Sequence, residues 1–431
     1  MTTKDTIIRL LREVEEGKYS NILLNQTFRE KEFLPGERAF ITEVFYGVLR
    51  RRLFLSEILA RKTKTAPKDW IRLLLLISLY QLLYMRSDDK GVVWEAAELA
   101  KHKFGVPVGR FVNGVLRSFL REKETLPAEI RREREDIYYS CPLWIYEDIK
   151  RRAPADYGEI LSRLKRIPRM SYRVNRLKYS APEFERLLEQ QQIPILRQID
   201  DVYYVEGGGL LHSAEFAQGK ITAQDAASYL AAKNLDPRGD DIVLDACSAP
   251  GGKLAVLAEL MENRGEITAL DIYPHKMKLL RETCALLGIR NATPVNLSAV
   301  KIPLQGKRFT KILCDVPCSG YGVISKKPES LYSKKKENMA QLPLLQYDIL
   351  SACAEALSPG GTLLYSACTF LREENGDVIG KFFANHPDFH PESLMIPEGV
   401  SGLFDEYGGF TIDWREEFLD GFYFAKMIKR K

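Results

Sequence analysis

The sequence predicts an α/β fold in three parts: an all-helical region, a small α+β connector, and a mostly parallel sheet covered by helices on both faces. Three observations predict it. The 431 residues exceed the usual length of one domain, roughly 100–200 residues. Apolar residues recur at helical spacing over residues 3–122. From about residue 221 onward, short apolar segments alternate with amphipathic helical patterns, which is typical of parallel sheets.

The expected helical domain spans residues 1–128. Five or six helices fit between its probable breaks, which lie at Gly17, 34–36, 65–67, 87–89 and 105–107. The most apolar run, Ile71 to Tyr84, is shorter than the roughly 18–20 apolar residues that cross a bilayer. We therefore expect a buried helix there and no membrane association. The N-terminus is charged and lacks the apolar segment of a secretory signal, so a cytoplasmic protein is expected.

Basic residues are concentrated in this first region. Residues 1–125 contain 23 Lys and Arg against 16 Asp and Glu, a surplus of seven, whereas the whole chain carries a net charge of +5. Such a surplus favours binding to a phosphate backbone, although a solvated helix surface gives the same count. Nucleic-acid binding and a solvated surface both remain open at this point.

The connector spans residues 129–220, and the sheet domain spans residues 221–431. The connector combines a short helical stretch with extended segments at 171–175 and 202–205. The expected strands of the sheet domain are Ile242–Ala246, Glu266–Asp271, Thr293–Leu297, Lys311–Asp315, Gly361–Ser366 and Phe422–Met427.

A glycine-rich turn follows the first strand of the sheet domain and precedes a helical pattern. It consists of Cys247, Ser248, Ala249, Pro250, Gly251, Gly252 and Lys253. Glycines let a ligand approach the backbone, and the helix start offers free N–H groups. Asp271, twenty residues after Gly251, ends the next strand, where a carboxylate can bind ribose hydroxyls. The turn matches neither the dinucleotide nor the P-loop motif, which favours S-adenosylmethionine over NAD and ATP; a purely structural turn is the alternative.

Two of the seven cysteines stand at the ends of expected strands. Cys318 follows Asp315, and Cys368 follows the strand at 361–366, so both thiols should face the ligand crevice. A thiolate suits addition to carbon 6 of a cytosine, which activates carbon 5 toward a methyl donor, and a second group must then remove the carbon-5 proton. Asp315, protonated or sharing a proton, could hold cytosine N3. The remaining cysteines are expected to be buried or uninformative, without disulfides or metal.

These residues resemble the motifs of the RNA 5-methylcytosine methyltransferase family: Asp245-Ala-Cys-Ser-Ala-Pro-Gly-Gly-Lys253, Asp315-Val-Pro-Cys-Ser-Gly320, Tyr365-Ser-Ala-Cys-Thr369 and Asp420-Gly-Phe422. The N-terminal region is similar to the NusB-like RNA-binding domain of bacterial members, notably at Phe45-Tyr-Gly-Val-Leu-Arg50, Leu79-Tyr-Gln-Leu-Leu83 and Phe111-Val-Asn-Gly-Val-Leu-Arg117. The resemblance covers nearly the whole chain. It implies a Rossmann-like S-adenosylmethionine-dependent methyltransferase domain behind a NusB-like domain.

The resemblance also implies roles for individual residues. Cys368 would add to carbon 6, Cys318 would assist product release, and Asp315 would contact base and cofactor. Residues 247–253 and Asp271 would hold the cofactor, S-adenosyl-L-methionine. The implied partner is 16S ribosomal RNA before full subunit assembly, with no metal and no membrane. The oligomeric state and the target cytosine are not predicted.

One departure from the family lies after the third strand of the sheet domain. Ser298 occupies the position where the family usually has an Asp that binds the adenine. Its hydroxyl, or Asn296, could still bond the adenine amino group.

Two alternatives remain open: a tRNA cytosine-5 methyltransferase, and a non-catalytic RNA-binding assembly factor. The helical domain disfavours the first, and the intact cysteines disfavour the second. Lys326, Lys327 and Lys334–Lys336 are candidate phosphate contacts, with an exposed solvated loop as the equal alternative.

Overall fold

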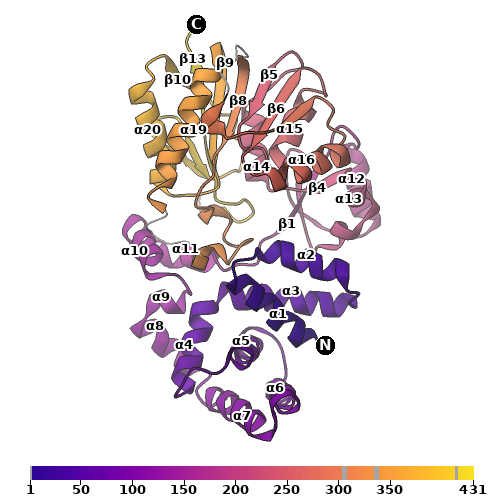
Figure 1. The fold of residues 1–431 in the computed structure, drawn as a ribbon, viewed down its shortest axis with the longest axis vertical. Coiled ribbons are helices and arrows are strands. Elements are labelled where there is room, and N and C mark those ends of the chain that lie inside the picture. Colours follow the sequence, from indigo (N-terminus) through magenta and orange to yellow (C-terminus); the bar gives the residue numbers. More distant parts are fainter. Residues whose placement is uncertain (1, 303–307, 334–338, 413–415) are drawn as a thin grey trace. The chain divides into compact units, whose positions relative to one another are not determined.

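The computed structural model describes residues 2–302, 308–333, 339–412 and 416–431. The chain forms two compact units (Figure 1). Unit 1 comprises Met1–Ile167 together with Ile324–Lys334, and unit 2 comprises Pro168–Val323 together with Lys335–Lys431.

Unit 1 is helical. Its helices are α1 (Thr3–Glu15), α2 (Ser20–Glu30), α3 (Pro35–Arg50), α4 (Arg52–Lys62), α5 (Asp69–Tyr84), α6 (Asp89–Phe104), α7 (Val106–Leu120), α8 (Thr125–Glu133), α9 (Glu135–Tyr138), α10 (Leu143–Arg152), α11 (Tyr157–Arg163) and α17 (Ser330–Ser333). Helix α5 is buried along most of its length, as its apolar sequence predicts. In the described part of the chain, no helix is long and apolar enough to cross a membrane.

The described residues 3–120 contain seven helices, one more than the five or six expected. The unexpected break lies at Arg51, between α3 and α4, where neither glycine nor proline marks it. A distant residue helps to stabilise it: the backbone N–H of Leu53, near the start of α4, donates 2.9 Å to the hydroxyl of Ser140. The break therefore depends on a tertiary contact that local sequence does not reveal.

Unit 2 begins with a four-stranded antiparallel sheet in the order β2-β3-β1-β4. Its elements are β1 (Met170–Val174), α12 (Ala181–Gln190), β2 (Ile195–Ile199), β3 (Val202–Val205), η1 (Gly209–His212), α13 (Ala214–Ala217) and β4 (Ile221–Ala223). A buried ion pair attaches this sheet to the rest of the unit, since Arg173 of β1 pairs with Glu259 of α15 (Gly252–Leu260).

The larger sheet of unit 2 has the order β11-β12-β13-β9-β8-β5-β6-β7, with β10 paired to β13. Strands β5 to β9 run parallel, and β13 runs antiparallel to β9. The strands are β5 (Ile242–Asp245), β6 (Glu266–Asp271), β7 (Ala292–Asn296), β8 (Phe309–Asp315), β9 (Leu357–Ala367), β10 (Phe389–Glu392), β11 (Gly402–Phe404), β12 (Phe410–Ile412) and β13 (Tyr423–Lys429). Every strand expected in this domain is present, within a few residues at each end.

Helices cover both faces of this sheet (Figure 1). One face is covered by α14 (Ala226–Asn234), α15 and α16 (Pro274–Leu287), and the other by α19 (Leu342–Ala356) and α20 (Gly376–Asn385). The connections contain three 3-10 turns, η2 (Ala299–Lys301), η3 (Tyr321–Val323) and η4 (Arg372–Glu374). The chain runs from β5 outward to β7, then returns to β8 on the other side of β5. In such sheets, ligands bind where the order reverses, at the carboxyl ends of the strands. The predicted Rossmann-like α/β class is confirmed.

Candidate active site

The glycine-rich turn lies at the carboxyl end of β5, beside the point where the strand order reverses. The backbone N–H of Ser248 donates 2.7 Å to the carbonyl of Leu270, which fastens the turn to β6. Gly251 has a φ of +104°, and a Cβ there would lie 3.0 Å from Leu280 Cδ1 and 3.1 Å from Thr283 Cγ2. Both conformation and space therefore require glycine at residue 251.

Two buried polar side chains at this turn are poorly paired. No well-formed hydrogen bond reaches either carboxylate oxygen of Asp245 or the hydroxyl of Ser248 among the described residues, although Ser248 and the Cys247 backbone lie near enough to lower the pKa of Asp245 against the larger effect of burial. Burial raises the pKa of Asp245 to about 7. Buried polar groups are normally satisfied, so this arrangement fits a polar, positively charged ligand that would pair with them. S-adenosylmethionine, with its sulfonium and ammonium groups, fits this donor and acceptor set.

The second predicted ligand residue, Asp271, ends β6 and is 6% exposed. Its Oδ1 accepts 2.9 Å from the backbone N–H of Tyr273, and its Oδ2 lies 3.6 Å from Lys276 Nζ. Asn296 donates 2.8 Å to the Asp271 carbonyl, so its side-chain N–H supports the strand end. Ser298 is half-buried just before η2, and its hydroxyl does not cap that turn.

Asp315, at the end of β8, bonds to a residue of the glycine-rich turn and to a residue of β9. Its Oδ2 accepts 2.8 Å from Lys253 Nζ, and its Oδ1 accepts 2.7 Å from the Ser366 hydroxyl. Burial favours the neutral amine of Lys253, but the Asp315 carboxylate beside it holds the pKa of Lys253 above its ordinary value. Lys253 also lies 4.9 Å from the centre of the Phe422 ring. The structure therefore gives Asp315 an ammonium partner, where the sequence suggested a shared proton.

The two predicted cysteines are brought together. Cys318 and Cys368 are 50 residues apart in sequence, yet their Sγ atoms lie 3.1 Å apart. Both side chains are half-buried. The hydrogen bond to Cys368, together with burial, raises the pKa of the Cys318 thiol. Cys318 is therefore held as a neutral thiol against the sulfur of Cys368.

A network of polar residues that the sequence analysis did not single out supports the two cysteine turns. The buried Glu374 accepts from the Ser319 backbone N–H at 2.8 Å and from Gln346 Nε2 at 2.9 Å. Gln346 also donates 3.0 Å to the carbonyl of Pro317. The hydroxyl of Ser319 donates 2.7 Å to that of Thr369. These bonds fix the positions of Pro317 and Ser319, on either side of Cys318, and of Thr369, which follows Cys368.

The Asp420-Gly-Phe422 motif contacts the loop after Cys318 through its backbone. Gly421 N–H donates 3.0 Å to the carbonyl of Gly322, and a Cβ on Gly322 would overlap the Gly421 carbonyl. The turn after Cys318 and this distant motif can approach only because both positions are glycine.

Three family models match the chain: the NusB family over residues 1–121, the RsmF/B-like ferredoxin-like domain over 141–200, and the 16S rRNA methyltransferase RsmB/F over 232–428. A Bacillus subtilis protein described as a probable ribosomal RNA small subunit methyltransferase B is 34% identical, over 100% of this chain and 99% of its own. The chain belongs to the ribosomal RNA small subunit methyltransferase B family.

Further comparisons agree with this family. The ribosomal RNA small subunit methyltransferase B of Shewanella oneidensis is 30% identical over 96% of both chains. The crystal structure of PH0851 superposes with a TM-score of 0.83 at 26% identity, covering 100% of this chain and 99% of that one. The family resemblance read from the motifs and from the NusB-like N-terminal region is confirmed.

Not every residue considered from the sequence lies at this family site. Cys284, Cys314 and Cys353 are buried, as expected. Lys326 and Lys327 belong to the segment that folds within unit 1. Lys334–Lys336 lie outside the described residues. In the part of the chain that the structure describes, no group of three or more metal-ligating side chains is present.

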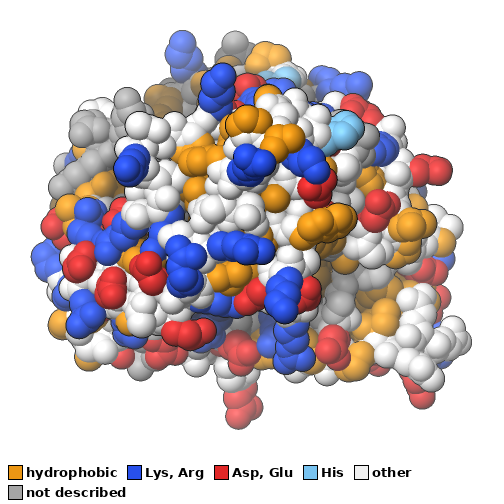
Figure 2. All heavy atoms as spheres, turned by 90° about the horizontal axis from the view of Figure 1, so that it is seen from below, with side chains coloured by type: hydrophobic (Ala, Val, Ile, Leu, Met, Phe, Trp, Pro, Cys, Tyr) orange, Lys and Arg blue, Asp and Glu red, His pale blue; other side chains and the backbone are white. Residues whose placement is uncertain are grey.

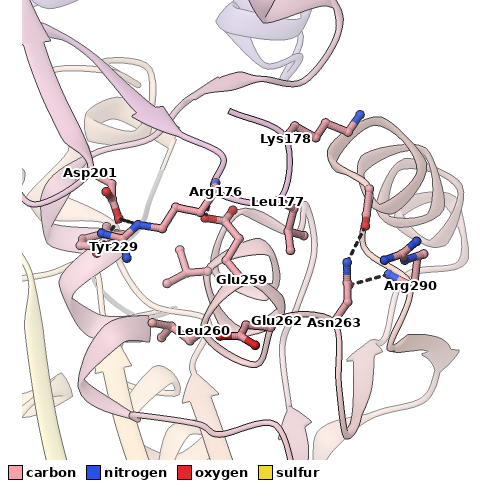
Figure 3. Close-up of a pocket in the computed structure, with 12 residues that line it drawn as sticks. Arg176, Leu177, Lys178, Asp201, Tyr229, Glu259, Leu260, Glu262, Asn263 and Arg290 are labelled. Carbon is pink, nitrogen blue, oxygen red and sulfur yellow. Dashed lines mark hydrogen bonds and ion pairs between the residues drawn. The ribbon is translucent and has the colours of Figure 1, made fainter. Parts of the chain in front are cut away.

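A separate pocket of about 710 Å³ lies in unit 2 beside the end of α15 (Figure 3). It contains none of the predicted site residues. Arg176 pairs there with Asp201 at 2.7 Å, and the Asn263 side chain donates to the Gly288 carbonyl and accepts from the Arg290 backbone N–H. We assign it to the attachment of the small sheet.

Proposed function

We propose that this chain transfers a methyl group from S-adenosylmethionine to carbon 5 of a cytosine in 16S ribosomal RNA, through a covalent bond between Cys368 and the base. The pair of thiols 3.1 Å apart, beside the Lys253–Asp315 ion pair, carries the proposal. The relatives' names supply the ribosomal RNA of the small subunit as substrate. The RNA would be bound in the cytoplasm before full subunit assembly.

Covalent addition explains why a cysteine is needed. The Cys368 thiolate forms a bond to carbon 6, which makes carbon 5 electron-rich. The cofactor would supply an electrophilic methyl group to carbon 5; the methyl–sulfonium bond would break, and its electron pair would remain on sulfur as a neutral thioether. A base then removes the proton from carbon 5, the C6–S bond breaks, and the aromatic ring returns as the thiolate leaves. No oxidant or reductant is required.

The charged and polar groups around the two thiols favour a different role for each. The Coulomb interaction with Cys368 is one of the causes that raise the pKa of Lys253, so the ammonium in turn stabilises negative charge on the Cys368 sulfur. Cys318, whose pKa is raised, stays protonated at the start. This contrast favours Cys368 as nucleophile and Cys318 as the residue that assists release.

The remaining predicted residues would hold the cofactor and the base. Residues 247–253, Asp271 and Ser298 would bind S-adenosylmethionine, with Asp245 facing its positive charge. Asp315 would contact both cofactor and cytosine. We propose the domain limits 1–128, 129–220 and 221–431 for RNA binding, connection and catalysis. A flipped or unpaired cytosine is required, because a stacked base cannot reach a half-buried thiol.

Bisulfite sequencing of small-subunit rRNA tests the proposal. Cells lacking the gene would be complemented with the wild type, with Cys368→Ala, or with Cys284→Ala as the matched control on α16. We expect one 5-methylcytosine to be lost and then restored by the wild type and the control only. Unchanged rRNA together with a lost tRNA 5-methylcytosine would favour a tRNA enzyme. Unchanged methylation in both RNAs would favour a non-catalytic assembly factor.

The role of Cys318 has its own test. Cys318→Ala should accumulate a protein–RNA adduct that survives a denaturing gel, because addition proceeds and release is impaired. The double variant Cys318→Ala with Cys368→Ala should form none. An adduct that persists in the double variant would contradict Cys368 as the nucleophile.

A further inference from the structure

A groove of about 760 Å³ runs between helices α6 and α7 of unit 1. The two helices lie close together because Gly109 of α7 meets α6: a Cβ there would lie 2.7 Å from Lys101 Cβ and 2.9 Å from the Ala97 carbonyl. The apolar lining comes mainly from Val93, Trp94, Val106 and Leu120. Figure 2, seen from the end at which α6 and α7 lie in Figure 1, shows hydrophobic side chains among many Lys and Arg side chains.

Trp94 is the unusual residue of this groove. It is 69% exposed, although tryptophan is mostly buried in folded proteins. An exposed indole offers a flat face on which a nucleobase can stack, independently of the sequence of the nucleic acid. A core role is excluded because the side chain faces solvent.

The charge of the groove lining is strongly positive. It includes Lys90, Lys101, Arg110 and Arg117 against one carboxylate, Glu98, which pairs with Lys101 at 3.0 Å. Lys90, Arg110 and Arg117 are exposed, and the charged group of none of the three has an ion-pair or hydrogen-bond partner among the described residues. Arg110 and Arg117 are two turns apart on α7, about 10 Å along its axis, so they can contact different phosphates.

We propose that this groove binds an unpaired stretch of the RNA substrate, with one base stacked on Trp94 and the backbone on Lys90, Arg110 and Arg117. The inference rests on the proposed function for the identity of the RNA. An RNA occupant is favoured over a protein because three uncompensated cations surround a single exposed aromatic ring, the combination that single-stranded nucleic acid requires. The groove would therefore supply affinity, and the site in unit 2 would supply chemistry.

Filter binding of in vitro transcribed small-subunit rRNA to the full chain tests the inference. Trp94→Ala should weaken binding about 5- to 150-fold, and Trp94→Phe should retain most of the affinity because a ring remains. Arg110→Glu with Arg117→Glu should also lower the slope of log affinity against log salt by about 1.4, or about 0.7 for each lost phosphate contact. The control is Lys64→Glu with Lys68→Glu, two exposed residues of the same unit outside α6 and α7.

Methylation kinetics separate this inference from the proposed function. We expect Trp94→Ala to raise KM and to leave kcat at saturating rRNA within about twofold of wild type. A wild type that methylates no rRNA cytosine would refute the proposed function. A methylating wild type whose RNA affinity is unchanged in the groove variants, or equally weakened in the Lys64 and Lys68 control, would refute the groove alone. A change of oligomeric state at constant RNA affinity would also refute it and assign the groove to a second copy of the chain.

Discussion

Asp245→Asn should remove a stability cost that the wild-type protein incurs as the pH rises. Burial raises the pKa of Asp245 from its ordinary value of 3.8 to about 7 in the folded chain. Between these values the unfolded chain has lost the proton and the folded chain has kept it, so stability falls with rising pH. Below pH 4 the cost is absent, and above pH 7 it is complete. Asparagine carries no charge at any of these pH values.

The size of this cost follows from the shift. A difference of about 3 pKa units corresponds to about 4 kcal/mol, at about 1.4 kcal/mol for each unit. About 2 kcal/mol of it develops between pH 5 and pH 7. Over that interval the wild type should therefore lose about 2 kcal/mol relative to Asp245→Asn, whatever constant cost or gain the substitution itself brings.

Hydrogen exchange read by mass spectrometry is the suitable assay, since amides of β5 and β6 report the opening of unit 2 separately from unit 1. Cofactor-free wild type and variant would be compared at pH 5, 6, 7 and 8, with intrinsic exchange rates corrected for pH. The difference in opening free energy should change steadily up to pH 7 and then level off. A difference that stays constant from pH 5 to pH 8 would refute the assignment of a buried, unpaired carboxyl at this turn.

Three further predictions concern the turn, the cysteine support and the attachment of the small sheet. Gly251→Ala should lower Tm by about 2–8 °C, because a side chain at φ +104° costs about 1–2 kcal/mol. Gly252→Ala is the control and should change Tm little, since the nearest atom to its new Cβ would lie 3.7 Å away. Calorimetry measures both values of Tm. Glu374→Ala should slow single-turnover methylation about tenfold by releasing Ser319 and Gln346, and Glu374→Gln, which keeps an acceptor oxygen, should restore the rate. Arg173→Met should cost about 3–5 kcal/mol in urea unfolding by leaving Glu259 buried without its partner, and adding Glu259→Met should recover most of that loss.

Much of the sheet domain could be predicted from sequence because its signals are local. The strands show as short apolar segments, and the turn at Gly251 shows as a glycine pair between a strand and a helix. Cys318 and Cys368 could be placed at the same edge, since the carboxyl ends of parallel strands meet there. The direct contact of their sulfur atoms could not be predicted, because it depends on the path of two loops.

The ion-pair and hydrogen-bond partners of charged residues could not be predicted from the sequence. Glu374 follows Arg372 and Glu373, a run that suggests a solvated surface, yet it is 1% exposed and bonded to Ser319, 55 residues away. Lys253 was expected at the cofactor, and its ion pair with Asp315 spans 62 residues. Such pairs depend on tertiary approach, for which spacing within one segment carries no information.

The segment after the Cys318 turn decides how the role of the helical domain should be tested. Residues 324–333 follow η3 of unit 2 in sequence but fold within unit 1. There, Glu329 accepts from the backbone N–H and hydroxyl of Ser20 at 3.0 and 2.8 Å, and the Tyr332 hydroxyl lies 3.0 Å from that of Ser140. The buried side chains of Ile324 and Leu331 belong to the same segment.

Deleting the helical domain would therefore do more than remove an RNA-binding surface. It would remove the partners of Glu329 and Tyr332 and release the chain four residues beyond Gly320, next to Cys318. Loss of activity in such a truncation would follow equally from lost RNA affinity and from a displaced catalytic turn. Substitutions on the solvent face of α6 and α7 would change RNA affinity without displacing the catalytic turn. The segment after that turn contacts Ser20, Arg50 and Ser140, which lie outside α6 and α7. A loss of affinity at constant kcat in Trp94→Ala would thus assign RNA binding to the helical domain in a way that no truncation can.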